Sequence, residues 1–176
     1  MIYTIDIKFV SNYIYSILEV LLMINAFTVS FFGHRQISDY CIFEELEALI
    51  KSLLNENEYV VFLVGRNGEF DKLVSSAIKK VQKNFLEYNC CHTLVLPYDT
   101  AEYRNNFSAF WDFYDSIEIF DPLGKTHFKS VITKRNKNMI DKSDLVIFYI
   151  ENQIGGTFEA YKYACAQSKK IIIINS

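Results

Sequence analysis

The sequence predicts an α/β fold: a Rossmann-like three-layer sandwich in which helices cover both faces of a mainly parallel sheet. The expected strands are short, continuous apolar runs such as FTVSFF and LVIFYI, rather than alternating patterns. Such runs are typical of strands buried on both faces, as in parallel sheets. Segments with a helical spacing of apolar residues separate the runs. The expected strands are residues 27–32, 59–64, 93–96, 117–120, 145–150 and 171–174.

Four helices are expected between the strands. Ser38 or Asp39 caps the first helix, which extends to about Leu54 because its apolar residues recur every three or four positions. Glu69 or Asp71 begins the second helix, where a carboxylate complements the helix dipole. This second helix reaches about residue 88. The third and fourth helices are expected over residues 128–140 and 158–167.

Residues 99–116, DTAEYRNNFSAFWDFYDS, are expected to be irregular. Six aromatic residues stand there among acids and amides. Three interpretations remain open for this segment: a lid, a contact between subunits, or a loop whose aromatic side chains hold it against the edge of the domain.

The composition indicates one globular domain. A chain of 176 residues with 51% apolar and 22% charged residues is long enough for a single core. The net charge of −3 and the pI of about 5.6 show no basic excess, so no nucleic-acid partner is expected. The four cysteines form no CxxC pair, and the three histidines have no metal-ligand spacing. This predicts reduced, mostly buried thiols in a cytoplasmic protein without a metal or a cofactor.

Residues 1–24 stand apart from the Rossmann-like domain, which is expected over residues 25–176. They are apolar, but charged residues divide them into stretches too short to span a bilayer, so no membrane partner is expected. The segment is either an extra helix that packs on the domain or on a second copy, or the result of a start assigned too early. The second interpretation is favoured because Met23 shortly precedes the first strand. A chain that begins at Met23 is expected to fold normally.

Three glycine turns directly follow expected strands and predict a binding site. Parallel strands end at the same edge of a sheet, and free backbone N–H groups at that edge favour anionic ligands. The complete phosphate-binding motifs GxxxxGK[ST] and GxGxxG are absent, so each turn taken singly is also explained by turn chemistry alone. The turns are Gly33-His34-Arg35, Gly65-Arg66-Asn67-Gly68 and Gly155-Gly156-Thr157.

Five side chains are candidates for polar contacts at this edge. Arg135 is the expected cation, since a guanidinium holds phosphate through two parallel hydrogen bonds, although a solvated basic helix face would also explain it. The Thr157 hydroxyl can cap its helix or contact a phosphate. His34 can transfer a proton, bind phosphate or cap the turn. Glu69 and Asp71 can hold ribose hydroxyls, although helix capping explains Asp71 equally well.

Four segments, SFFGHRQI, FLVGRNGEFDKLV, KRNKNMIDKSDLVIFYI and GGTFEAYKYA, resemble the SLOG superfamily of Rossmann-like proteins. That superfamily takes in YpsA-like bacterial proteins, DprA-type proteins and the Lonely Guy phosphoribohydrolases. The closest likeness is to the small YpsA-like proteins of Firmicutes. The resemblance covers about residues 27–175 and implies a Rossmann-like domain with a nucleotide ligand.

The Lonely Guy pattern joins an Arg-x-x-x-Met helix to a PGGxGTxxE turn, and this chain is similar to it in part. Glu159 stands one residue before the glutamate of that turn, and Ala160 occupies the glutamate position. One residue rotates a helical side chain by about 100°, so the resemblance implies ligand binding more than catalysis. The matching residues are Arg135, Met139, Gly155, Gly156 and Thr157.

The expected function is binding of a nucleotide or a nucleotide-derived small molecule. One alternative is an enzyme that cleaves or transfers the base of a nucleoside monophosphate, similar to nucleoside deoxyribosyltransferases, with Glu159 and Arg135 as catalytic residues. Another is an oligomeric interaction module, and a homo-oligomer is expected from the aromatic excess and the family analogy. The expected ligand-binding residues are Gly33, His34, Arg35, Gly65, Arg66, Asn67, Gly68, Glu69, Asp71, Arg135, Met139, Gly155, Gly156 and Thr157.

Overall fold

The computed structural model of the chain describes residues 25–37, 41–84 and 89–174. The proposed N-terminal extension, residues 1–24, and the alternative start at Met23 lie outside the described residues. Within the described ranges, no helix is both long enough and apolar enough to cross a membrane.

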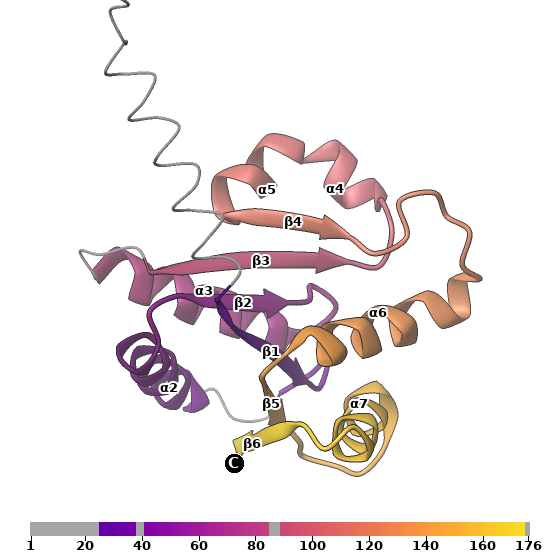
Figure 1. Cartoon of the computed structure of the whole chain (residues 1–176). Coiled ribbons are helices and arrows are strands. Elements are labelled where there is room, and N and C mark those ends of the chain that lie inside the picture. Colours follow the sequence, from indigo (N-terminus) through magenta and orange to yellow (C-terminus); the bar gives the residue numbers. More distant parts are fainter. Residues whose placement is uncertain (1–24, 38–40, 85–88, 175–176) are drawn as a thin grey trace, which may run out of the picture.

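Six strands form one sheet in which every pairing of the described strands is parallel (Figure 1). Their order across the sheet is β4-β3-β2-β1-β5-β6. The prediction of a Rossmann-like α/β fold is therefore confirmed. The strands are β1 (Phe27–Gly33), β2 (Val60–Val64), β3 (Cys90–Leu96), β4 (Ser116–Ile119), β5 (Leu145–Tyr149) and β6 (Lys170–Ile174).

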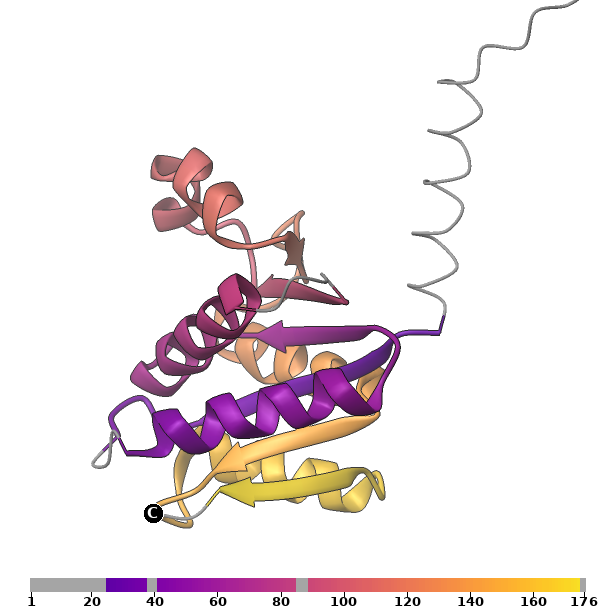
Figure 2. The same ribbon diagram turned by 90° about the vertical axis from the view of Figure 1, so that its left-hand side faces the viewer.

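Helices cover both faces of the sheet, as the buried strands require. Figure 2 shows α2 (Ile42–Glu56) and α3 (Glu69–Asn84) in front of the sheet, with α6 (Phe128–Lys142) and α7 (Gly155–Ala166) behind it. Each face holds its own apolar core, one packed against α2 and α3 and the other against α6 and α7. The result is the predicted three-layer sandwich.

Strand β5 explains why the strands read as continuous apolar runs. Leu145, Ile147 and Tyr149 belong to the core under α2 and α3, whereas Val146 and Phe148 belong to the core under α6 and α7. All five residues are buried. Side chains alternate between the two faces of a strand, so a strand covered on both sides must be apolar at every position.

The segment expected to be irregular contains two short helices beyond the β4 edge of the sheet (Figure 1). Helix α4 (Ala101–Asn105) is capped by Thr100, whose hydroxyl accepts a hydrogen bond from the Tyr103 N–H at 3.1 Å. Helix α5 (Phe107–Phe113) follows directly. The expectation of irregular structure missed this Thr cap, which is an ordinary helix-start signal.

Several element boundaries also differ from the sequence-based expectation, and two elements, β3 and α7, begin three residues earlier than expected. Strand β3 begins at Cys90 rather than Thr93, because Cys90, Cys91 and His92 pair with β2 and are buried, although His92 is polar. Helix α7 begins at Gly155 rather than Phe158. The third glycine turn is therefore the first turn of a helix, and its backbone N–H groups have the orientation that an anion requires.

Candidate functional site

A cavity of about 480 Å³ opens at the carboxyl ends of β1, β2 and β5. Its walls are the segments that follow these three strands, together with one side of α6. The cavity brings together ten of the residues predicted for the site: Gly33, His34, Arg35, Asn67, Gly68, Asp71, Arg135, Gly155, Gly156 and Thr157.

The cavity lies where the strand order reverses. Strand β1 pairs with β2 on one side and with β5 on the other. The chain after β1 leads to α2 on one face of the sheet, whereas the chain after β5 leads to α7 on the opposite face. Open parallel sheets bind ligands at such a switch point because the connections diverge there and leave a crevice. The register places Gly33 beside Tyr149, so the β1 and β5 turns face each other.

Gly33 and Gly155 are each required by the local geometry. A Cβ on Gly33 would lie 2.2 Å from Cγ of Phe70, so any side chain there would displace the start of α3. Gly155 has a φ of +85°, in the left-handed region that favours glycine. Thr157 closes the arrangement, because its hydroxyl donates to the Gly33 carbonyl at 2.7 Å and ties α7 to β1. That hydroxyl proton is therefore used within the fold rather than offered to a phosphate.

Arg135 is the most unusual group of the cavity. It is only 3% exposed, and its Nη1 donates to the Met139 sulfur at 3.2 Å. Its Nε has no hydrogen-bond partner among the described residues, and no described oxygen accepts from the guanidinium. A buried cation normally has a full set of acceptors. Met139 itself lies in the core under α6 and does not line the cavity.

Asp71 is the nearest counter-charge in the cavity wall. One carboxylate oxygen accepts a hydrogen bond from the Asn67 N–H at 2.7 Å. Burial raises the pKa of Asp71 above its ordinary value, against the opposing effects of the Arg135 charge and of the N–H groups of Asn67 and Gly68. Gly65 lies behind this pair: a Cβ there would lie 2.8 Å from both Arg135 Nη1 and Asp71 Oδ2. Gly65 therefore makes room for the two charged groups and does not line the cavity.

His34 and Arg35 form the rim on the β1 side. The His34 Nε2 accepts a hydrogen bond from the Asn152 N–H at 3.4 Å, which joins the turn after β1 to the turn after β5. Arg35 is exposed and makes no ion pair within the described part of the chain. Asn136 and Asn152, which the sequence analysis did not name, also line the cavity. Asn136 directly follows Arg135 in the sequence, and Asn152 lies in the turn after β5, so these positions could have indicated both residues as part of the site.

Besides Gly65 and Met139, three predicted site residues are placed elsewhere. Arg66 turns away toward α4, where it pairs with Glu102 at 2.9 Å and its guanidinium carbon lies 4.6 Å from the centroid of the Phe110 ring. Glu69 accepts from the backbone N–H of Ile37 at 3.0 Å and thereby holds the turn after β1. Glu159 is exposed on α7 and pairs with Lys162 at 2.6 Å.

The cavity has the chemistry of an anion site. Across the ranges that the structure describes, no three histidine, cysteine or acidic side chains come together as metal ligands. The donors that converge are a guanidinium whose Nε has no partner among the described residues, a rim arginine and the N-terminal backbone N–H groups of α7, with Asp71 as the acid in the wall. Such donors bind phosphate or carboxylate oxygens.

No protein-family model matches the chain, and a search of curated proteins finds no significant match. Two solved structures are similar in fold. DNA processing protein A from Helicobacter pylori, which binds single-stranded DNA, aligns with a TM-score of 0.63 and 17% identity over 87% of this chain and 67% of its own. DNA processing protein A from Streptococcus pneumoniae aligns with a TM-score of 0.63 and 16% identity over 89% of this chain and 52% of its own. The chain therefore spans about two thirds of one neighbour and about half of the other.

These neighbours correct several expectations from the sequence. The prediction of a closest likeness to YpsA-like proteins is wrong, since the similar structures are DNA processing proteins. The predicted small nucleotide ligand and the exclusion of a nucleic-acid partner are overturned by the same finding, because the Helicobacter pylori protein binds single-stranded DNA. The expected homo-oligomer rested partly on the family analogy and loses that support.

Proposed function

We propose that the chain binds single-stranded DNA at the carboxyl edge of its sheet, with a phosphate of the strand held in the cavity. The observation that carries this proposal is the buried Arg135 guanidinium, whose Nε has no partner among the described residues although it borders an open cavity. The fold likeness to a protein that binds single-stranded DNA supports the choice of ligand.

The first turn of α7 supplies the second set of donors for that phosphate. The N-cap residue of α7 is Ile154, whose side chain makes no capping hydrogen bond. The first N–H groups of a helix have no intrahelical acceptor and carry a partial positive charge. Gly155 and Gly156 line the cavity, so their backbone approaches a ligand without an intervening side chain. A phosphate between this turn and Arg135 would satisfy both sets of donors.

The size of the cavity favours a single strand over a duplex. A space of about 480 Å³ is enough for one nucleotide unit with its phosphate. A single strand offers such a unit freely, whereas a base-paired duplex must first be unstacked and unpaired at a cost of a few kcal/mol. Cytoplasmic location is part of this proposal and is supported by the free thiols of Cys90 and Cys91.

The test is a binding titration followed by fluorescence anisotropy. The probes are a labelled oligothymidylate of about 20 nucleotides and a duplex of the same length, each measured at low and at physiological salt. The protein is expected to prefer the single strand. Arg135→Gln is expected to weaken that binding about 10-fold to 100-fold, since the variant cannot form a charge-assisted hydrogen bond to the phosphate. Arg135→Lys, which keeps the charge but not the paired donors, should fall between Arg135→Gln and the unmodified protein.

Arg104→Gln is the matched control, because Arg104 is exposed and pairs with Asp99 outside the cavity. Thermal unfolding of each variant shows whether it has folded. Equal binding by the Arg135 and Arg104 variants would contradict the proposed site. Absence of oligonucleotide binding by the folded, unmodified protein at low salt would contradict the proposed function.

A further inference from the structure

Resting on that proposed function, we propose that the bound strand continues from the cavity into the groove between α6 and α7. Figure 1 shows these two helices side by side on one face of the sheet, and they pack against each other. A second hollow of about 480 Å³ lies between them. It shares Ile132, Asn136 and Gly156 with the first cavity, so the two spaces meet at the start of α7.

Gly156 is the point of passage between the two spaces. A Cβ added there would meet no atom within 4 Å, so the region above the residue is open. Unlike Gly155, it has no left-handed backbone angle that would demand glycine. The absence of a side chain at this position is thus unexplained by packing or by strain. It leaves room for a chain of nucleotides to cross the first turn of α7.

The lining of the groove matches the chemistry of a sugar-phosphate strand. Lys137 and Lys162 contribute two cations to it against one acid, Glu159. The Lys137 ammonium lies 4.7 Å from the centroid of the Tyr163 ring, which holds it within the groove. Lys162 is exposed and pairs with Glu159 at the surface, where such pairs are weak and exchange readily. Both lysines are therefore available to phosphates.

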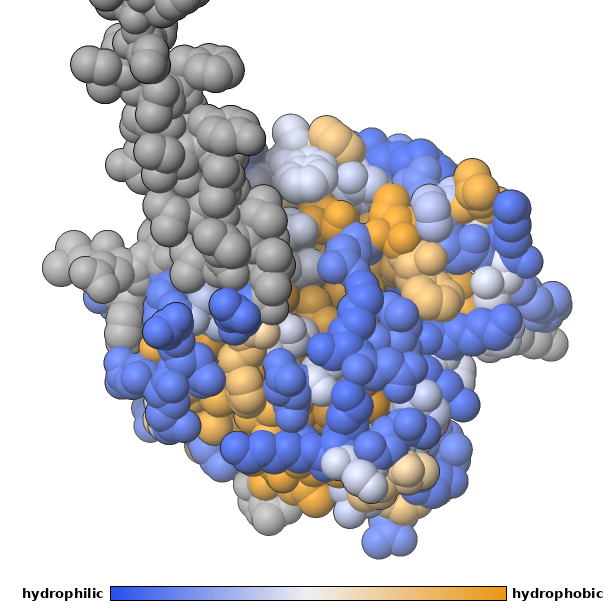
Figure 3. Space-filling view, viewed as in Figure 1, coloured by the Kyte–Doolittle hydropathy of each residue, from blue (hydrophilic) through white to orange (hydrophobic). Residues whose placement is uncertain are grey.

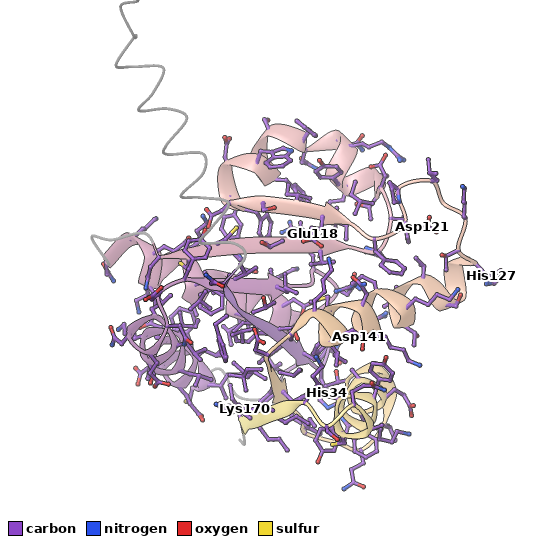
Figure 4. All side chains as sticks on the ribbon, viewed as in Figure 1. His34, Glu118, Asp121, His127, Asp141 and Lys170 are labelled. Atoms are coloured by element: carbon purple, nitrogen blue, oxygen red, sulfur yellow. The ribbon has the colours of Figure 1, made fainter. Side chains whose placement is uncertain are left out.

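The remaining side chains around the groove are also compatible with a bound strand. The Tyr163 hydroxyl donates to Asp141 at 2.9 Å, which fixes the tyrosine on α7 against the end of α6. Figure 4 labels Asp141. Ile132, Ala160 and the Tyr163 ring supply apolar surface for sugars and bases. Figure 3 shows that the surface over α6 is mainly hydrophilic, as expected of a face that meets a charged strand.

The test compares two oligothymidylates, one of about three and one of about ten nucleotides. The short probe is long enough for the cavity alone, and the long probe reaches the groove. The unmodified protein is expected to bind the long probe at least about tenfold more tightly. The double variant Lys137→Ala/Lys162→Ala is expected to abolish most of that ratio. For this variant, the slope of log K against log salt concentration should be shallower by about 1.4. Each lysine that no longer neutralises a phosphate of a single strand accounts for about 0.7 of that change.

Two further variants make the result specific. Gly156→Phe places a ring in the open passage and is expected to reduce the long-to-short ratio in the same way. Lys125→Ala/Lys170→Ala removes the same charge from exposed positions that line neither space, and it should keep the ratio (Figure 4 shows Lys170 on β6).

The outcomes separate this inference from the proposed function. If the unmodified protein binds neither probe, the proposed function fails. If it binds both and the Lys137→Ala/Lys162→Ala variant keeps the full ratio and salt slope, the strand does not follow the groove, although the cavity site stands. If the Lys125→Ala/Lys170→Ala control reduced the long-to-short affinity ratio equally, the effect would be one of general charge, and the proposed path along the groove would be overturned.

Discussion

Two neighbouring segments of the chain carry opposite charge and take different places in the fold. Residues 99–121, here the acidic segment, contain six acidic residues and one arginine. Residues 122–142, here the basic segment, contain six lysines and arginines and one aspartate. The acidic segment forms α4, α5 and β4 at one edge of the sheet (Figure 1). The basic segment ends in α6, which lines the cavity. The net charge of −3 therefore hides a local basic surface, and local fields are what a nucleic acid meets.

The two segments also use their polar groups differently. In the acidic segment, Asp115 accepts hydrogen bonds from the His92 N–H, Gln82 and Lys79, and so joins β3 and α3 to the chain before β4. In the basic segment, Lys134 is exposed and forms no ion pair among the described residues. Changes in the acidic segment should therefore affect stability, whereas changes beside the cavity should affect DNA binding.

The largest expected effect concerns His92, which lies under the acidic segment. Its ring is fully buried against Tyr114, with centroids 4.7 Å apart, and burial lowers its pKa from 6.5 to about 3. The unfolded chain gains a proton near pH 6.5 and the folded chain only near pH 3. The free energy of unfolding is therefore highest above pH 6.5 and should fall by up to about 1.4 kcal/mol per pH unit as the pH drops toward 3.

Urea unfolding at a series of pH values measures this slope. His92→Gln removes the titrating group, while the carboxylates that also titrate remain in both proteins. The difference between the two slopes between about pH 6.5 and about pH 4 then reports on His92 alone. Parallel curves for the two proteins would show that the His92 ring is not held neutral by burial.

The second expected effect is the loss of the Asp115 hydrogen bonds. Although burial acts against its charged form, the hydrogen bonds from His92 N–H, Gln82 and Lys79 hold the pKa of Asp115 below its ordinary value. Asp115→Ala leaves these donors unpaired and is expected to lower the free energy of unfolding at neutral pH by about 2 kcal/mol. Affinity for single-stranded DNA should stay unchanged, as measured on folded protein by anisotropy. Weakened DNA binding in that variant would place part of the interface on the acidic segment.

The strand ends of the site could be predicted from the sequence, whereas the direction of several side chains could not. Continuous apolar runs locate buried parallel strands, and the ends of parallel strands meet at one edge, so Gly33, Gly65 and Gly155 marked the right region. The direction of Arg66 depends on Glu102 and Phe110, which follow more than thirty residues later. No local pattern contains that information.

The burial of Arg135 did leave a signal in the sequence. Val131, Arg135 and Met139 are spaced by four residues, which places the arginine on the buried face of α6. Arg135 was predicted from its place late in the helix near other cations, whereas this four-residue spacing indicates its burial. The proposed nucleic-acid partner was excluded for a different reason, because a net charge averages over the opposed acidic and basic segments.

The third expected effect is a gain in affinity for DNA when an acid is removed from the cavity itself. Asp71→Asn keeps an acceptor for the Asn67 N–H but removes the negative charge nearest Arg135. Affinity for single-stranded DNA is expected to rise about tenfold, which corresponds to one modest charge interaction near a protein surface. Burial raises the pKa of Asp71, so binding by the unmodified protein should also strengthen as the pH falls and the carboxylate gains a proton. Anisotropy titrations across the acid range measure both effects, and a pH dependence that survives in Asp71→Asn would assign it to another group.

The smallest expected effect separates two arginines that the sequence placed in one site. Arg35 is exposed on the rim of the cavity, whereas Arg66 is held against the acidic segment by Glu102 and Phe110. Arg35→Ala is expected to weaken binding of single-stranded DNA about threefold to fivefold, as for one exposed phosphate contact, and to reduce the salt slope by about 0.7. Arg66→Ala should leave DNA affinity unchanged and cost at most about 1 kcal/mol of stability, since it removes a partly exposed ion pair and one cation–π interaction. Anisotropy and urea unfolding on both variants give the comparison.

If Arg66→Ala weakened DNA binding as much as Arg35→Ala, the bound strand would extend across the β2 turn toward α4, and the acidic segment would no longer lie outside the interface.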